Sequence, residues 1–276
     1  CDQLGGGFHR YPTDARWLIP HFEKMLYDNA LLARTYVEAW QATGAPWLRD
    51  VATETLAYLG REMRAPGGGF AAAQDADSEN AEGKFFAWTP GEITARLGAA
   101  DARVVCRYFG VEAAGNFEPG SSVLSIPRDP DVVAVELGLG IDELAAIVQR
   151  ARTTLFAARS ERVAPGRDDK VVVAWNGLAI SAFARAARAF DDAAWLAPAR
   201  DAAAFVLDHM TGDRLFRTFK DGRTKGPGFL DDYAAFIAGL LDLYESTFEP
   251  RWIDAALRLD AVLDADFWDS EHGGFF

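Results

Sequence analysis

The sequence predicts an all-α fold, in which helical hairpins pack side by side and close into a double ring of helices. Three observations support this prediction. The 276 residues are 50% hydrophobic and 25% charged, which is typical of a globular protein with a large core. Apolar residues recur at helical spacing in three separate segments. Each segment is followed by a turn, a tryptophan, a second helical pattern and a phenylalanine, so the chain contains a repeat.

Three helical hairpins are expected from this repeat. Apolar residues at i, i+3, i+4 and i+7 mark the first helix of each hairpin, over residues 22–42, 177–190 and 233–245. A tryptophan opens each second helix, at Trp47, Trp195 and Trp252. The second helices lead into the pieces GGGF, RLF and GGF, which end at Phe70, Phe216 and Phe275.

The polar residues favour a closed arrangement of these hairpins. A helix pair alone leaves an apolar face uncovered, so such units stack on one another. Each first helix begins with a polar and aromatic cluster: HFEKMLYDN at 21–29, DDKVVVAWN at 168–176 and FLDDY at 229–233. Closure into a ring would gather these helix starts, with their positive dipole ends, around one central pocket.

Residues 85–165 interrupt the repeat. A strand is expected at 85–88, and Thr89, Pro90 and Glu92 then form a capping box with proline at the first helical position. Further along we expect short helices to Leu97 and over 101–108, a GNFEPGSS loop at 115–122, and a long helix over 141–159. We interpret residues 85–165 as a modified hairpin expanded into a lid, within one domain that covers residues 1–276.

Charge and composition exclude several classes of function. A formal charge of −13 and a pI near 4.8 disfavour binding to nucleic acid and to anionic membranes. No apolar run approaches the roughly 20 residues of a membrane-spanning helix. Cys1 and Cys106 have no CxxC spacing, which disfavours a zinc site and fits a reducing, cytoplasmic location. Without nucleotide-binding or HExxH motifs, we expect neither a cofactor nor a metal.

Several motifs are familiar as a group: DQLGGGFHRYPTD, PHFEKMLYDNALLA, AQDADSE, FFAWTPGEI, GNFEPG and DDKVVVAWNGLAI. In order, and over most of the chain, they resemble the helical domain of the thioredoxin-domain-containing family (DUF255) that includes spermatogenesis-associated protein 20 and YyaL-like proteins. The resemblance implies a six-hairpin glycosidase-like (α/α)6 toroid, similar to N-acylglucosamine 2-epimerase and cellobiose epimerase enzymes. It also implies a thioredoxin-like domain as a partner, which this sequence lacks. Since the chain opens on CDQLGGGF and the repeat gives about four of six hairpins, we interpret the toroid as incomplete.

The richest polar group lies at the start of the first hairpin: His21, Glu23, Tyr27, Asp28 and Asn29. Sugar pockets pair carboxylates and amides with flat aromatic rings, and sugar isomerisation needs a base such as histidine. Catalysis is therefore predicted for His21 and Asp28, and substrate binding for the other three.

Ordinary roles compete with this interpretation. A glutamate near a helix start suits the helix dipole, and Lys24 with Asp28 is typical of a surface ion pair. Asn29 falls in the apolar stripe, where it is either a ligand group or a structural clamp on a neighbouring loop.

Two further groups precede or follow this helix. His9, Arg10 and Tyr11 in HRYPTD, with Trp17, come after three glycines and are predicted to bind substrate; the alternative is a loop pinned by an ion pair between Arg10 and Asp14. The acids of QDADSE, Asp75, Asp77 and Glu79, lack the glycine and distal glutamate of a calcium loop. These acids form either a polar turn or part of the pocket. Substrate binding in the pocket is predicted for Asp75, Asp77 and Trp88.

The other two first helices begin with paired aspartates. One aspartate is a common helix cap, whereas two exceed what capping needs, and neighbouring carboxylates raise one another's pKa. Asp169 and Asp232 are therefore predicted to be catalytic, and substrate binding is predicted for Trp175, Asn176 and Tyr233.

These residues together predict a carbohydrate-active domain that binds a sugar in the central pocket. An epimerase or isomerase would use a base near neutrality, and a glycosidase would use two carboxylates. The alternative is a non-catalytic or redox-coupled binding platform that works with a thioredoxin-like domain.

Overall fold

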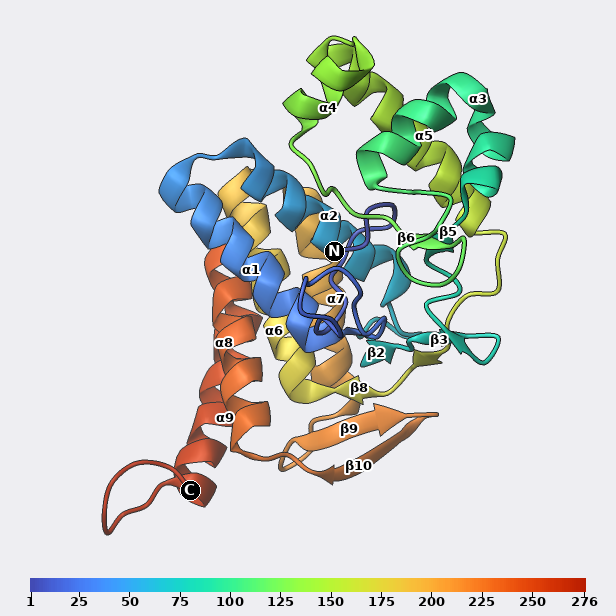
Figure 1. Cartoon of the computed structure of the whole chain (residues 1–276). Coiled ribbons are helices and arrows are strands. Elements are labelled where there is room, and N and C mark those ends of the chain that lie inside the picture. The colour runs from blue at the N-terminus through green and yellow to red at the C-terminus, as the bar shows by residue number, and fades with distance from the viewer. The chain divides into compact units, whose positions relative to one another are not determined.

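The computed structural model describes all residues 1–276, which divide into two compact units (Figure 1). The hairpin unit contains Lys24–Gln74 and Arg167–Phe276, and the insert unit contains Cys1–Glu23 and Asp75–Gly166. The division falls close to the predicted edges of the lid, although the insert unit also takes in the N-terminal segment. That the whole chain forms one domain stays a prediction.

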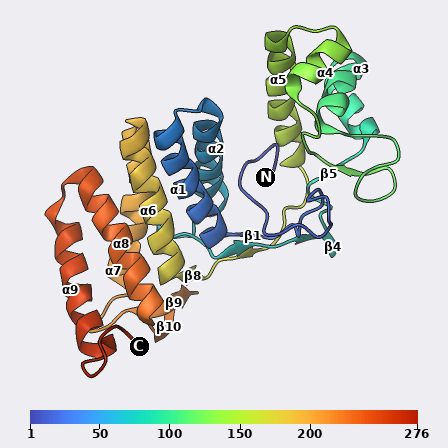
Figure 2. The same cartoon turned by 60° about the vertical axis from the view of Figure 1, so that its left-hand side comes forward.

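The hairpin unit consists of three helical hairpins: α1 (Leu26–Thr43) with α2 (Pro46–Glu62), α6 (Val173–Phe190) with α7 (Leu196–His209), and α8 (Leu230–Thr247) with α9 (Pro250–Phe267). The first helices form one row with α6 between α1 and α8, and each second helix packs on its own partner (Figure 2). The prediction of an all-α fold with short β pieces is confirmed. A row of first helices with second helices packed on it is the layering of an (α/α)6 toroid, and this unit holds three of its hairpins.

Short strands precede the first helices. One sheet joins β1 (Lys24–Met25), β2 (Ala73–Gln74) and β7 (Arg167–Asp168); another joins β8 (Val171–Val172) with the antiparallel pair β9 (Phe216–Lys220) and β10 (Arg223–Pro227). The first helix was predicted from residue 22, which is wrong at its start, because Lys24–Met25 pair with β2 and α1 begins at Leu26. Glu23 and Lys24 therefore do not lie one helical turn before Tyr27 and Asp28.

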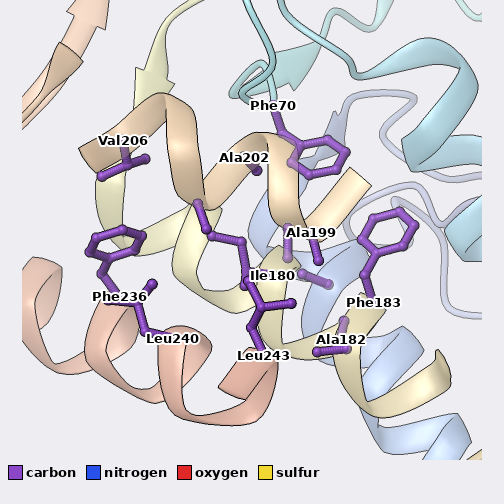
Figure 3. Packing of buried hydrophobic residues seen from close by; sticks show 14 of the residues in the cluster. Phe70, Ile180, Ala182, Phe183, Ala199, Ala202, Val206, Phe236, Leu240 and Leu243 are labelled. Atoms are coloured by element: carbon purple, nitrogen blue, oxygen red, sulfur yellow. The ribbon is translucent and has the colours of Figure 1, made fainter. Parts of the chain in front are cut away.

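The core of the hairpin unit lies between the two helix layers (Figure 3). Ile180 and Phe183 of α6 pack with residues of α7 and α8, and the Phe183 ring stacks on that of Phe70 with centroids 5.4 Å apart. Helix α6 is rich in alanine because it has neighbours on several sides, where small side chains allow close packing. Its closest approach to α8 is at Gly177 and Gly239, where an added Cβ would lie 2.4 and 2.6 Å from backbone oxygens.

Hydrogen bonds correct the register of the repeat by one residue. After each second helix the chain folds back, and a backbone amide donates to a carbonyl at the end of that helix: Ala71 to Met63, Phe216 to Met210 and Phe276 to Phe267. The three residues that precede these donors are therefore equivalent in the repeat, so Leu215 aligns with Phe70 and Phe275. Sequence similarity had matched Phe216 instead; this was wrong, since Leu215 is buried and Phe216 is 39% exposed.

The insert unit contains α3 (Pro90–Phe109), α4 (Pro130–Leu137) and α5 (Ile141–Arg159), with the strand pairs β3 (Asp77–Ser78) with β4 (Ala81–Glu82), and β5 (Ala87–Trp88) with β6 (Ser122–Val123). The capping box at Thr89 is confirmed, and α5 has the predicted bounds. Helix α3 breaks at Gly98, with a φ of 77°, which separates the two predicted short helices. No helix in either unit combines the length and apolar character needed to cross a membrane.

Candidate functional site

A histidine between two carboxylates is the main polar cluster of the insert unit. Nδ1 of His21 lies 2.7 Å from Oε1 of Glu82, and Nε2 lies 3.7 Å from Oε2 of Glu23. The ring of Tyr11 stacks on the imidazole, with centroids 5.1 Å apart. The His21 side chain is 26% exposed, so the imidazole is both held in place and open to solvent. We call His21, Glu23, Glu82, Tyr11 and Arg10 the histidine cluster.

Neighbouring core contacts position this cluster. Phe22 is buried and packs against the rings of His9, Phe86 and Phe117. The peptide groups on both sides of Phe22 bind the preceding segment, because the His21 amide donates to the Tyr11 carbonyl and the Arg10 amide to the Glu23 carbonyl. The Phe22 amide also donates to Oε1 of Glu82. The backbone that carries His21 is thereby fixed on a packed aromatic cluster.

Arg10 joins the cluster through Glu23. Its Nη1 lies 3.1 Å from Oε2 of Glu23, so the predicted ion pair between Arg10 and Asp14 is wrong. The Asp14 carboxylate instead accepts backbone bonds from Arg16, Leu18 and Ile19. The Ile19 amide is the largest of the influences that lower the pKa of Asp14, and the other two amides act in the same direction. Asp14 therefore shapes the loop rather than the cluster.

Trp17 lies at the outside of this loop. Its side chain is 82% exposed and its backbone is left-handed, with a φ of 58°. Left-handed backbone is unfavourable for a bulky residue, and it persists here because the Asp14 side chain holds the amides on either side. The loop thus presents an indole to solvent, as substrate binding by Trp17 would need.

The cluster can exchange a proton at one defined nitrogen. A carboxylate accepts only, so the contact with Glu82 assigns the Nδ1 proton to the neutral imidazole and leaves the Nε2 lone pair available. Glu23 lies on the Nε2 side at 3.7 Å, and its carboxylate also accepts from Arg10. This is the arrangement of a general base with an orienting carboxylate.

In the hairpin unit, the starts of α1, α6 and α8 lie at the same end, next to the short strands (Figure 2). Tyr27 of α1 and Trp175 of α6 are half-buried there, with ring centroids 5.0 Å apart. Asp28 lies in the first turn of α1 and is also half-buried. Aromatic groups from two hairpins and an acidic group from one therefore lie at this end of the unit.

The fourth residue of α6 and of α8 acts as a clamp. Asn176 accepts a bond from the Phe70 amide at 2.8 Å and donates to the Phe70 and Val172 carbonyls. Tyr233 accepts from the Leu215 amide at 2.9 Å, so both residues hold the loop that follows the preceding second helix. Asn29 occupies the same position in α1 and donates to the Met25 carbonyl. These contacts give Asn176 and Tyr233 structural roles, whereas substrate binding by the two residues stays a prediction.

Lys24 is not a surface residue. It is 1% exposed, and Nζ lies 4.3 Å from the centre of the Tyr58 ring, whose hydroxyl donates to Gln74. The interpretation of Lys24 and Asp28 as an ordinary surface ion pair is therefore wrong. The strand β1 turns Lys24 into the unit, which helical spacing did not reveal.

Asp232 is fully buried at the start of α8. It accepts hydrogen bonds from the Phe229 and Ala174 amides and from Nη1 of Arg217, at 3.0–3.1 Å. Asp232 thus caps its own helix and binds the first turn of α6. Burial raises the pKa of Asp232 above its usual value, although the two amides and Arg217 act against this.

Replacing Asp232 by asparagine should cost about 1–2 kcal/mol of unfolding free energy at neutral pH, because an amide nitrogen would face the Phe229 amide. The raised pKa means that the folded state binds the proton more tightly than the unfolded chain. The wild-type advantage is therefore greatest below the ordinary pKa of 3.8 and shrinks as the pH rises through the folded pKa. Urea unfolding of both proteins across this pH range measures the difference. Asp231→Asn, at an exposed neighbour, is the control, and a deficit that grows with pH would contradict the raised pKa.

Asp169 and Asp168 lie on the surface of the same unit. Asp169 is exposed and bonded to Nε of Arg167 at 2.5 Å. Asp168 binds Lys170 and Lys220. Partial burial is the largest single influence on the pKa of Asp168 and raises it, but the bonds from the two lysines together outweigh burial and lower it.

The remaining predicted residues have structural contacts. Asp75 accepts from the Ala76 amide at 2.7 Å, which fits the polar-turn alternative, and Asp77 is an exposed residue of β3. Trp88 is 2% exposed beneath the guanidinium of Arg162, 4.0 Å from the ring centre. No group of three metal-ligating side chains occurs in the structure.

The structure thus brings His21, Glu23, Arg10 and Tyr11 together in the insert unit, and Tyr27 with Trp175 in the hairpin unit. Glu82, which contacts His21, was missed. It follows His21 by 61 residues and is the last residue of β4, so no local pattern connects the two.

Comparisons with known proteins complete the description. No family model matches the chain. Among solved structures, it is similar to a D-mannose isomerase (13% identity, 98% of this chain and 67% of that one, TM-score 0.40) and to cellobiose 2-epimerase of Spirochaeta thermophila (16%, 99% and 82%, TM-score 0.35).

Relatives in sequence are closer. Over 310 aligned residues, which include all of this chain and 39% of the relative, the identity to spermatogenesis-associated protein 20 of Homo sapiens is 36%. An uncharacterised protein of Caenorhabditis elegans is 31% identical, with 100% of this chain and 42% of the relative covered. The chain spans about two-fifths of the length of these curated relatives. The resemblance read from the motifs is confirmed, and the chain is a homologue of a segment of spermatogenesis-associated protein 20.

Proposed function

We propose that this chain is a carbohydrate-active domain that moves a proton on a sugar, as an isomerase or epimerase does, with His21 as the base. The observation that carries the proposal is the partly exposed imidazole of His21, bonded through Nδ1 to Glu82 at 2.7 Å. A base so oriented removes the acidic proton from the carbon beside a sugar carbonyl. If the proton returns to the former carbonyl carbon and the hydroxyl proton passes to the former carbonyl oxygen, the sugar is isomerised. If the proton returns to the opposite face of the carbon that lost it, the sugar is epimerised.

The carboxylates of the cluster favour proton transfer over glycoside hydrolysis. A glycosidase needs one carboxylic acid that protonates the leaving group and one carboxylate on the other side of the sugar. Here Glu82 accepts from both His21 and the Phe22 amide, and Glu23 accepts from Arg10. Both are occupied in orienting other groups, so imidazole chemistry suits the cluster better.

Aromatic and cationic groups beside His21 support sugar binding. Tyr11 is 52% exposed, stacks on the imidazole and lies 5.7 Å from the Arg10 guanidinium, so the exposed part of its ring can contact the apolar side of a sugar ring. Arg10 lies next to Glu23, and its guanidinium can donate to a sugar hydroxyl or carbonyl oxygen.

Other predicted roles stay predictions. Asp28 and Asp169 lie in the hairpin unit, and their catalytic role stays a prediction. Asp232 already accepts three hydrogen bonds. A thioredoxin-like domain as partner and a cytoplasmic location likewise stay predictions, and no contact in either unit favours the redox-coupled alternative.

Deuterium exchange tests the proposal directly. The chain is incubated in D₂O with glucose, mannose, N-acetylglucosamine or cellobiose. Proton NMR follows the loss of the signal of the hydrogen on the carbon beside the carbonyl. We expect exchange with at least one sugar and a decrease of about 100-fold or more for His21→Gln, which keeps a donor for Glu82 and loses the base.

His272→Gln is the matched control, because His272 is a 79% exposed histidine bonded to an aspartate outside the cluster. It should leave the exchange rate unchanged. Equal exchange by wild-type and His21→Gln proteins would remove His21 as the base. Absence of both exchange and sugar binding across the panel would reject the carbohydrate proposal itself.

A further inference from the structure

The insert unit has a second concave site that the histidine cluster does not line. It is a cavity of about 690 Å³ between the end of α3, the loop after it, α4 and the loop that carries Arg16. Four arginines line it: Arg16, Arg103, Arg107 and Arg128. Such a concentration of one sign is unexpected in a chain with a net charge of −13, where acids outnumber bases by 41 to 28.

Protein carboxylates only partly neutralise these arginines. Glu136 is shared, since its Oε2 lies 2.5 Å from Nη2 of Arg107 and 3.6 Å from Nη1 of Arg128. Arg16 faces Asp14 at 3.6 Å, and Arg103 makes no ion pair. Two acids thus serve four guanidiniums, while the acid in the lining itself, Glu112, pairs with none of them. The cavity keeps an excess of positive charge.

Apart from the Glu112 carboxylate, which would repel an anion, the other polar groups of the cavity do not oppose one. Cys106 is half-buried, and burial raises the pKa of its thiol, so it stays neutral at physiological pH. Ser125 also lines the cavity, and its hydroxyl has no hydrogen-bond partner within the chain, which leaves a donor available. Guanidinium groups bind phosphate oxygens through paired N–H bonds, with better geometry than a lysine gives.

We propose that this cavity, which we call the arginine cavity, binds a small molecule through a phosphate group. The inference does not depend on the proposed reaction at His21, because the two sites share no lining residue. A free phosphate ion and the phosphate of a larger metabolite would use the same contacts, and suitable probes distinguish them.

The test compares glucose 6-phosphate, inorganic phosphate and glucose by isothermal titration calorimetry with the whole chain at low ionic strength. We expect glucose 6-phosphate to bind and glucose not to bind at the arginine cavity. Arg103→Gln should weaken binding about tenfold, because it removes one charge-assisted contact. Arg150→Gln is the matched control, since Arg150 is an exposed arginine of the same unit outside the cavity.

Glu136→Gln provides a test in the opposite direction. It removes the carboxylate that competes for Arg107 and Arg128, so phosphate should bind several-fold more tightly. This gain also separates the proposal from a simple loss of folding. Equal binding of inorganic phosphate and glucose 6-phosphate would identify the phosphate group alone as the ligand.

Two results would overturn the proposal. One is the absence of binding by both phosphates at about 10 mM, which is weaker than useful recognition of a metabolite. The other is binding that Arg103→Gln and Glu136→Gln leave unchanged, since the arginines would then have no part in it. Neither result bears on sugar exchange by His21.

Discussion

Replacing Gly177 by alanine is expected to destabilise the hairpin unit by about 3 kcal/mol. The added methyl group would lie 2.4 Å from the Ala235 carbonyl oxygen, and the nearest atoms are all backbone of α8. Backbone cannot rotate away as a side chain can, so α6 and α8 would have to separate and lose packing along their whole contact. Gly239→Ala, whose Cβ would lie 2.6 Å from the Gly177 oxygen, should act in the same way.

Gly60→Ala is the matched control for this prediction. Gly60 lies inside α2 with nothing within 4 Å of the position of an added Cβ. Alanine there should stabilise the chain by about 0.5–1 kcal/mol, because glycine loses more backbone entropy in a helix. Urea unfolding gives the sign of each change. Equal stability of Gly177→Ala and wild type would mean that α6 and α8 are farther apart than described.

Replacing Arg159 by methionine is expected to destabilise the insert unit by about 3–5 kcal/mol. Arg159 and Asp2 form a two-bond ion pair at 2.8 and 2.9 Å, and their side chains are only 5% and 4% exposed. Asp2 also accepts the Leu4 and Gly5 amides, which fixes the start of the chain on α5. Without the arginine, a buried carboxylate would keep its desolvation cost and lose its partner charge.

Hydrogen exchange locates this effect. The amides of Leu4 and Gly5 should lose protection first in Arg159→Met, since they depend on the Asp2 carboxylate. Arg96→Met removes an ion pair with Glu161 whose side chains are 48% and 65% exposed, and it should change stability by less than about 1 kcal/mol. Unchanged protection at Leu4 and Gly5 would show that Asp2 does not need its partner.

The sequence predicted an element correctly where all the residues that define it lie close together in the chain. The capping box at Thr89 and the bounds of the helix over 141–159 are as predicted, because both depend on residues within one or two turns. Two elements were missed although their signals were present. Asp221 and Gly222, both with positive φ, form the turn between β9 and β10, and Asp129 caps the short helix that ends at Gly138.

The candidate site was predictable only in part. His21 and Tyr11 were predicted as members of two separate polar groups, and the structure stacks their rings. Glu82 could not be identified, because its contact with His21 joins positions 61 residues apart. The clamp role of Asn176 likewise depends on the Phe70 peptide group, which lies 106 residues earlier in the chain.

The sequence by itself determined the hairpin repeat, the capped start of α3, the bounds of α5, and the family to which the motifs point. Apolar periodicity and capping act over a few residues, so they can be read in one dimension. Tertiary structure decided that Lys24 is buried, that Leu215 and not Phe216 aligns with Phe70, and that His21 lies against Glu82. Each of these depends on contacts between distant segments, where packing and the desolvation of charge select partners that local pattern does not specify.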